Sequence, residues 1–176
     1  MTTAKIDLKQ YIRNIPDFPK PGILYYDIST LMRNADAWQI AMGRLAAAVA
    51  PWAPDMLAAI EIARVPDGGA ACQPAGLWAG HAAQAGQAAR GTVSYSYDLE
   101  YGSDSLHIQA DAIEPGQRVV VMDDLLATGG TLNASVHLLR KVGADVVGAA
   151  TLIELTGLGG RGRLDIPVKT LLSYDE

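Results

Sequence analysis

Cysteine, long apolar runs and charge are all scarce in this sequence of 176 residues. The single cysteine, Cys72, cannot form an internal disulfide, which fits a reducing compartment. No run of about 18 apolar residues occurs, so we expect no membrane-spanning segment and no membrane partner. Met1–Ile15 lacks the apolar stretch of a secretory signal, and we therefore expect a cytoplasmic protein.

Charged residues make up only 19% of the chain, and acidic residues exceed basic ones by 19 to 14. The net charge of −5 and the pI of about 5.1 argue against a nucleic-acid partner. They do not exclude phosphate ligands, because backbone amides can bind phosphate. The hydrophobic fraction of 49% and the length indicate one folded domain over residues 1–176 rather than a disordered chain.

Apolar runs alternate with helical periods and predict an α/β protein. A short helix is expected over residues 5–13, and the prolines of Ile15–Ile23 predict a rigid, irregular segment. Asn34 is expected to cap a helix that ends at Pro51. Further helix is expected at 131–142, stopped by Gly143, and strands at 56–61 (buried), 92–97, 118–122 (central) and 145–155. This alternation implies a mostly parallel sheet covered on both faces.

The strongest local signal follows the run 118–122, where an apolar strand ends in Asp123 and Asp124. A loop of small residues comes next and leads into a helix: Ala127, Thr128, Gly129, Gly130 and Thr131. Its backbone N–H groups and the helix N-terminus can hold a phosphate, and the two carboxylates can accept from vicinal sugar hydroxyls. No lysine follows the glycines, which excludes a Walker A loop. The alternative is a simple strand-end turn with solvated acids and a helix cap.

The run DDLLATGGT resembles the phosphoribosyl diphosphate (PRPP) motif of the type I phosphoribosyltransferases, and the adenine phosphoribosyltransferases in particular. Three more segments resemble that family: IRNIPDFPKPGILYYDISTLM, YDLEYGSDSLHIQADAIEPGQ, and IELTGLGGRGRL with the terminal TLLSY. The likeness covers residues 6–61 and 92–176. It implies a type I phosphoribosyltransferase fold, with a five-stranded, mostly parallel sheet flanked by helices and a small N-terminal hood at residues 1–34.

The resemblance also implies a reaction, in which adenine and PRPP give AMP and pyrophosphate in purine salvage. Mg²⁺ would arrive with PRPP and need no direct protein ligand, and the chain would form a homodimer. In that reading Asp123 and Asp124 hold the ribose hydroxyls, and residues 127–131 hold the 5′-phosphate. Glu100 acts on the purine as general acid or base. The resemblance assigns four residues to adenine: Leu24 and Tyr26 through their backbone, and Tyr25 and Leu158 as a sandwich around the ring.

Residues 62–90 depart from the family, because ten of these 29 residues are alanine and five are glycine. The family has a Ser-Arg-Gly-Phe turn here and a basic Arg-Lys-Pro-Gly-Lys-Leu-Pro block that faces pyrophosphate. Both are missing, although the spacing from Glu61 to Tyr97 matches the family's. The segment is a poor sequence for a helix and a strand inside a core.

The segment 62–90 has the length found in the family but not its residues, which suggests that it is an out-of-frame translation. If Ile62–Pro66 is encoded ATC-GCG-AGG-GTT-CCN, moving the frame by one base gives Ser-Arg-Gly-Phe. The same shift over Ala83–Arg90 allows Arg-Lys-Pro-Gly-Lys-Leu-Pro. The cause is either a sequencing error or a real double frameshift, and an authentic divergent segment is the alternative.

Two other functions stay open at this point. The missing basic block favours a catalytically weakened relative that only binds PRPP or AMP. A phosphoribosyltransferase for guanine, xanthine or orotate is the third interpretation, and the YDLEYG and PDFPKPGI runs favour adenine over it.

Overall fold

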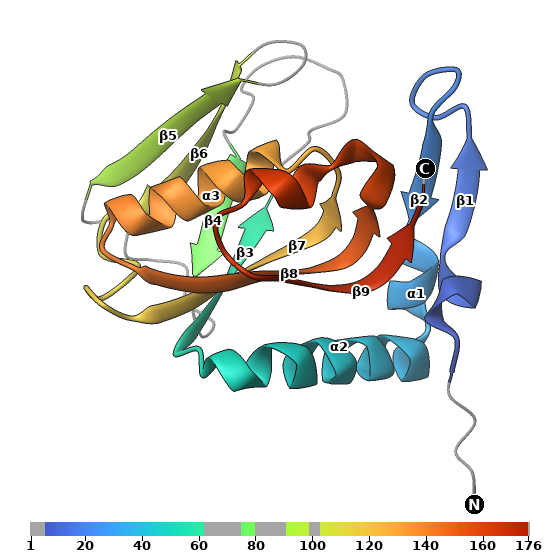
Figure 1. Cartoon of the computed structure of the whole chain (residues 1–176), viewed down its shortest axis with the longest axis horizontal. Coiled ribbons are helices and arrows are strands. Elements are labelled where there is room, and N and C mark those ends of the chain that lie inside the picture. The colour runs from blue at the N-terminus through green and yellow to red at the C-terminus, as the bar shows by residue number, and fades with distance from the viewer. Residues whose placement is uncertain (1–5, 62–74, 80–90, 99–102, 176) are drawn as a thin grey trace, which may run out of the picture. The chain divides into compact units, whose positions relative to one another are not determined.

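The computed structural model describes residues 6–61, 75–79, 91–98 and 103–175 (Figure 1). Contacts within the chain are concentrated in two compact units, Met1–Ala47 and Ala48–Glu176. Within the described ranges, no helix is long and apolar enough to cross a membrane.

The first unit opens with a 3₁₀ helix, η1 (Leu8–Tyr11), followed by an antiparallel hairpin of β1 (Arg13–Pro16) and β2 (Leu24–Asp27). The helix predicted over 5–13 is therefore wrong in type and extent. Asp7 caps η1 by accepting from the Lys9 N–H at 3.1 Å, and the backbone is already extended at Ile12. Local pattern could not show the hairpin, because its pairing joins residues across the irregular, proline-containing segment between the two strands.

Two α-helices complete the first unit, α1 (Ser29–Arg33) and α2 (Ala35–Val49), and the last two residues of α2 belong to the second unit. The predicted cap is confirmed, since Asn34 Oδ1 accepts from the Ala37 N–H at 3.0 Å. Helix α2 gives way to the short 3₁₀ helix η2 (Ala50–Trp52), which contains Pro51, so the predicted end is confirmed as well.

The second unit is built on a seven-stranded sheet in the order β5-β6-β4-β3-β7-β8-β9. Its strands are β3 (Met56–Glu61), β4 (Ala75–Ala79), β5 (Thr92–Asp98), β6 (Ser103–Gln109), β7 (Arg118–Leu126), β8 (Asp145–Leu155) and β9 (Val168–Tyr174). The neighbours β3, β7, β8 and β9 run parallel, as predicted. Strand β4 pairs antiparallel with β3, and β5 with β6.

Two details of the sheet differ from expectation. It has seven strands rather than five, because β4 and the β5–β6 hairpin extend the parallel centre. Strand β3 is present as predicted, but it alternates instead of being buried throughout: Ala58 is fully buried, whereas Leu57 is 49% exposed.

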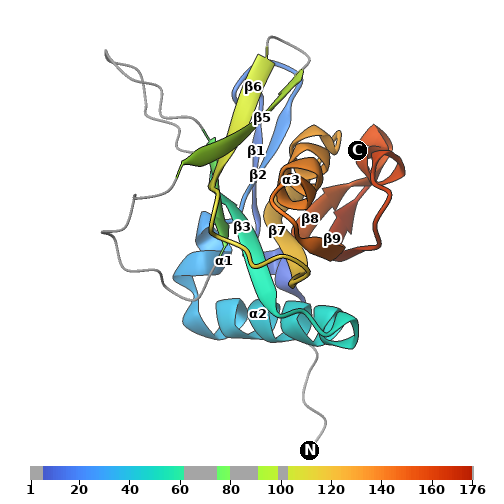
Figure 2. The same cartoon turned by 90° about the vertical axis from the view of Figure 1, so that its left-hand side faces the viewer.

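The core lies between the central strands and helix α3 (Gly130–Lys141), which lies along one face of the sheet (Figures 1 and 2). Val119, Val120 and Val121 are all fully buried, as expected for a central strand with both faces covered. Helix α3 ends where predicted: Gly143 has φ +97°, and its N–H donates to the Arg140 carbonyl at 3.1 Å.

Candidate functional site

The candidate site lies at the carboxyl end of β7, where the chain turns into α3. Open α/β sheets bind ligands at the carboxyl ends of their strands. Strand β7 ends at Leu126 and α3 begins at Gly130, so only three residues connect them. Gly129 adopts φ +80° at the N-cap of α3, which favours glycine and turns the loop sharply into the helix.

A small cavity of about 70 Å³ forms at this turn. The structure brings together there one of the two predicted acids and the whole predicted loop. Its lining residues are Asp123, Leu125, Leu126, Ala127, Thr128, Gly129, Gly130, Thr131 and Leu132. Asp124 is exposed and is not among the lining residues. The N-terminus of α3 places partial positive charge at this cavity, which suits an anion.

The two acids interact electrostatically. Burial of Asp123, with the Asp124 carboxylate as the second cause, raises the pKa of Asp123 to about 8. Asp123 also accepts a hydrogen bond from the Asp124 N–H at 2.9 Å. At neutral pH Asp123 is therefore mostly protonated, which reduces its repulsion toward a phosphate.

A second backbone segment closes the loop from outside. It is the 3₁₀ helix η4 (Gly160–Arg163), in the connection between β8 and β9. A Cβ at Gly160 would lie 2.1 Å from the Ala127 carbonyl oxygen, and one at Gly129 would lie 2.5 Å from the Gly160 carbonyl oxygen. Two glycines thus let the two backbones touch. Sequence reasoning assigned Gly129 to phosphate approach and missed Gly160, although the run GGRGR was visible.

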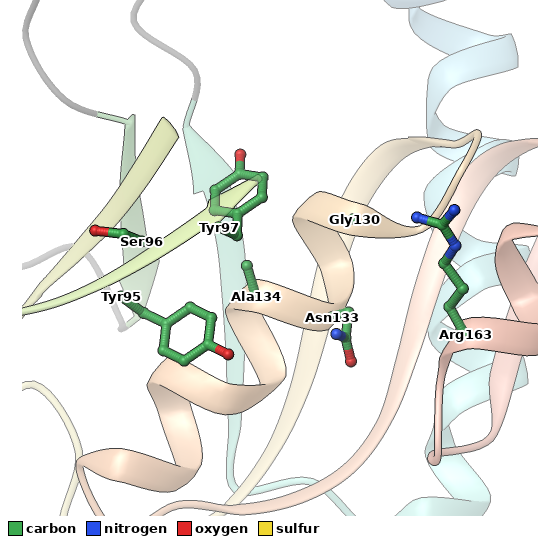
Figure 3. A pocket seen from close by; sticks show the side chains of 7 residues that line it. All are labelled: Tyr95, Ser96, Tyr97, Gly130, Asn133, Ala134 and Arg163. Atoms are coloured by element: carbon green, nitrogen blue, oxygen red, sulfur yellow. The ribbon is translucent and has the colours of Figure 1, made fainter. Parts of the chain in front are cut away.

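A larger pocket of about 310 Å³ adjoins the first, and Gly130 lines both. Its walls come from β5, α3 and η4, and its lining residues are Tyr95, Ser96, Tyr97, Gly130, Asn133, Ala134 and Arg163 (Figure 3). Figure 3 shows the Arg163 guanidinium on the side of the pocket near Gly130. Arg163 and Asn133 were not predicted from sequence, because single polar residues at helical positions carry no local signal.

Comparison with known proteins identifies the family. A model of the phosphoribosyl transferase domain matches residues 81–175, which is more than half of the chain. An adenine phosphoribosyltransferase of Gluconacetobacter diazotrophicus is 70% identical over 176 residues, which covers all of both chains. The chain belongs to the adenine phosphoribosyltransferase family.

Solved structures agree with this family membership. The crystal structure of adenine phosphoribosyltransferase from Thermoanaerobacter pseudethanolicus superposes with a TM-score of 0.76 at 34% identity, covering 95% of this chain and 98% of that one. The enzyme from Saccharomyces cerevisiae, complexed with an imino-altritol bisphosphate and adenine, gives a TM-score of 0.69 at 26% identity, with 94% and 96% coverage. The expected type I phosphoribosyltransferase fold is thereby confirmed.

Two predicted features of this family member fall outside the described residues. Glu100 lies in 99–102, between β5 and β6, and its catalytic role stays a prediction. Of the altered segment 62–90, only β4 (Ala75–Ala79) is described. The match to the family model begins at residue 81, inside this segment, although β3 lies upstream of it.

The residues predicted to bind adenine belong to both units. Leu24, Tyr25 and Tyr26 lie on β2 of the first unit, where Tyr25 is 43% exposed and Tyr26 is buried. Successive residues of a strand point their backbone N–H and C=O groups to opposite edges, so residues 24 and 26 point theirs to the same edge of β2. In the second unit Leu158 ends the 3₁₀ helix η3 (Thr156–Leu158) and is 49% exposed. Each unit thus offers an exposed apolar side chain, and the predicted sandwich stays a prediction.

Metal binding by protein side chains alone finds no support in the part of the chain that the structure describes, where no three His, Cys, Asp or Glu residues gather. Asp123 lines the cavity at the phosphate loop, and Asp124 follows it in the sequence. Mg²⁺ is commonly held by one or two carboxylates, waters and substrate phosphates. The acid pair fits an ion that is carried mainly by its substrate.

Proposed function

We propose that this chain transfers the 5-phosphoribosyl group from PRPP to adenine, giving AMP and pyrophosphate. The observation that carries the proposal is the cavity at the end of β7, which combines Asp123 with the loop 127–131 in a chain 70% identical to an adenine phosphoribosyltransferase. A phosphate loop beside a carboxylate pair suits a substrate that has both a 5′-phosphate and a vicinal diol.

The phosphate loop and the acids would act by holding the ribose. The loop N–H groups and the positive end of α3 bind the 5′-phosphate, while Asp123 and Asp124 accept from the ribose hydroxyls. The C1′–oxygen bond to pyrophosphate then breaks as the adenine N9–C1′ bond forms through an oxocarbenium-like state. Holding both partners in line accounts for much of such an acceleration.

One proton must leave the purine, and Glu100 is the residue proposed to accept it. Mg²⁺, when bound with PRPP, neutralises charge on the leaving pyrophosphate. Exclusion of water around the ribose would protect PRPP from hydrolysis.

Adenine would be selected by the backbone of Leu24 and Tyr26 and sandwiched by Tyr25 and Leu158. The yeast relative, whose structure contains adenine, supports this choice of base. We further propose that the chain is cytoplasmic, in line with the single cysteine, and that it forms a homodimer, as the family resemblance implies.

The altered segment 62–90 favours a second candidate, a relative that binds PRPP or AMP with little turnover. The test is a panel of adenine, guanine, xanthine and orotate, each with PRPP and Mg²⁺, read out as nucleotide formed and as AMP bound. Turnover with adenine alone supports the proposed enzyme. AMP binding without turnover supports the second candidate instead. Turnover with another base, or neither turnover nor binding, contradicts the proposed enzyme.

A further inference from the structure

The connection between β8 and β9, residues 156–167, is anchored in the core near its C-terminal end, where Ile166 is 8% exposed and Leu164 packs against the core. Its first part, 156–163, lacks such an anchor: only Gly160 is buried there, and Leu158, the one large apolar side chain, is 49% exposed. Burial of apolar side chains therefore contributes little to holding this turn, 156–163, in place. Polar contacts supplement it there.

Arg161 supplies these contacts. Its Nε donates to Glu154 Oε1 at 2.9 Å and its Nη2 donates to Glu154 Oε2, which makes a two-pronged pair. Nη1 donates to the Val168 carbonyl at 2.7 Å, and Nη2 also reaches Thr170 Oγ1 at 3.0 Å. All three nitrogens of the guanidinium are thus engaged by β8 and β9.

Glu154 is the buried half of this network. Its side chain is 7% exposed and also accepts from Thr170 Oγ1 at 3.0 Å. The hydrogen bonds from Arg161 are the main cause that lowers the pKa of Glu154, so the carboxylate stays charged. The pair is only half-buried, because the Arg161 side chain is 46% exposed. Even a fully buried ion pair is weak evidence for stability, because apolar residues of similar size often stabilise as well or better.

The network lies at the level of the phosphate loop. Glu154 pairs in register with Leu126, the last residue of β7, and the loop begins at the next residue. Gly160 immediately precedes Arg161 and is in backbone contact with Ala127 and Gly129. Where Arg161 fixes the turn, Gly160 fixes the outer wall of the loop.

We propose that Arg161 and Glu154 are positioning residues for the phosphoribosyl substrate, which hold the β8–β9 turn against the loop 127–131 and so set its phosphate-binding shape. The proposal rests on the proposed function of that loop. Neither residue is among those that line the two cavities. They act through Gly160.

The experiment compares Arg161→Lys and Glu154→Gln with wild type in KM for PRPP, kcat, AMP affinity and unfolding midpoint. Lysine keeps the charge but loses the two-pronged geometry. We expect KM for PRPP to rise about tenfold or more and kcat to change by less than about threefold, since small displacements of a binding group are costly. Arg140→Lys is the matched control, because it weakens an exposed pair with Asp165 (2.7 Å) at the other end of the same segment. It should leave KM unchanged.

The double variant Glu154→Leu/Arg161→Met separates positioning from stability. We expect its unfolding midpoint to return toward wild type while KM for PRPP stays raised. Single variants that lower the midpoint but leave KM and AMP affinity unchanged would overturn the proposal, as would a double variant that restores KM. If wild type binds AMP without turnover, the AMP affinity ratios decide the proposal alone. A wild type that binds neither PRPP nor AMP refutes both the site and the proposal.

Discussion

At the scale of single residues, Asp123 is expected to lower the stability of the fold as the pH rises, although the proposed reaction needs its side chain. Its pKa is about 8, raised from an ordinary 3.8 by burial and by Asp124. Between about pH 4 and pH 8, Asp123 in the folded chain therefore keeps a proton that the unfolded chain has already released. Because the unfolded state binds fewer protons in that window, stability falls as the pH rises through it.

The substitution Asp123→Asn should remove this loss of folding stability with rising pH. We expect its unfolding midpoint to exceed that of wild type at pH 8, with little difference near pH 4, and its phosphoribosyl transfer to be lost. For a chain of this size, each kcal/mol of unfolding free energy shifts the midpoint by about 2–4 °C. Thermal unfolding at a series of pH values measures this shift. An unchanged pH slope in the variant would show that Asp123 titrates normally.

Asp27 acts in the opposite sense and in a different pH range. Hydrogen bonds from Ser29 and from Arg13 lower its pKa to about 2. Its contribution to stability is present above about pH 4 and is lost as the pH falls toward 2. Unfolding experiments between pH 5 and 9 therefore report on Asp123 without interference from Asp27.

The contact between the η4 backbone and the loop gives a second prediction at this scale. Gly160→Ala places a Cβ 2.1 Å from the Ala127 carbonyl oxygen, so the turn or the loop must move. We expect a loss of about 1–3 kcal/mol of stability and a raised KM for PRPP. Gly162→Ala is the control in the same turn, because nothing lies within 4 Å of its Cβ. Equal behaviour of the two variants would refute the contact.

At the scale of elements, signals from neighbouring residues were sufficient where the structure itself is local. The Asn34 cap, the Gly143 stop and the buried valines of β7 follow from capping, left-handed backbone and apolar runs. The β1–β2 hairpin and the turn held by Arg161 depend on specific pairings between residues in different elements, which capping and periodicity signals do not report. Strand β4 lies in an alanine-rich stretch without a period. No local pattern could have shown these elements.

The cap of α2 can be tested by itself. Asn34→Ala removes the acceptor for the Ala37 N–H and should cost about 1 kcal/mol of stability. Asn34→Asp keeps an equivalent acceptor and should behave like wild type. Chemical denaturation of both variants measures the difference. An equal loss in both would mean that the side-chain oxygen is not what stabilises this helix end.

For the molecule as a whole, the segment 62–90 decides between an enzyme and a binding protein. The relative from Gluconacetobacter diazotrophicus aligns over the full length of both chains, as expected if the frame is lost and then regained without a change in length. The fold and the phosphate loop were predictable because their motifs are intact. The part of the site that would bind pyrophosphate was not predictable, because the family's basic block is missing from the sequence.

The DNA encoding residues 61–92 should read Ser-Arg-Gly-Phe and Arg-Lys-Pro-Gly-Lys-Leu-Pro in the neighbouring frame. A chain carrying that in-frame segment should turn over faster than the chain as printed. Charge-assisted contacts to a leaving group contribute about 2–4 kcal/mol each, which corresponds to a gain of about 30-fold or more. A DNA sequence without both blocks would show that the segment is authentic.

The most direct test of the account is the formation of AMP from adenine and PRPP with Mg²⁺, on purified chain whose intact mass confirms residues 62–90. The account predicts AMP as the product, bound at the loop 127–131, at a rate that the altered segment reduces. A chain that forms no AMP would contradict the proposed enzyme, and one that also binds neither PRPP nor AMP would contradict the site as well.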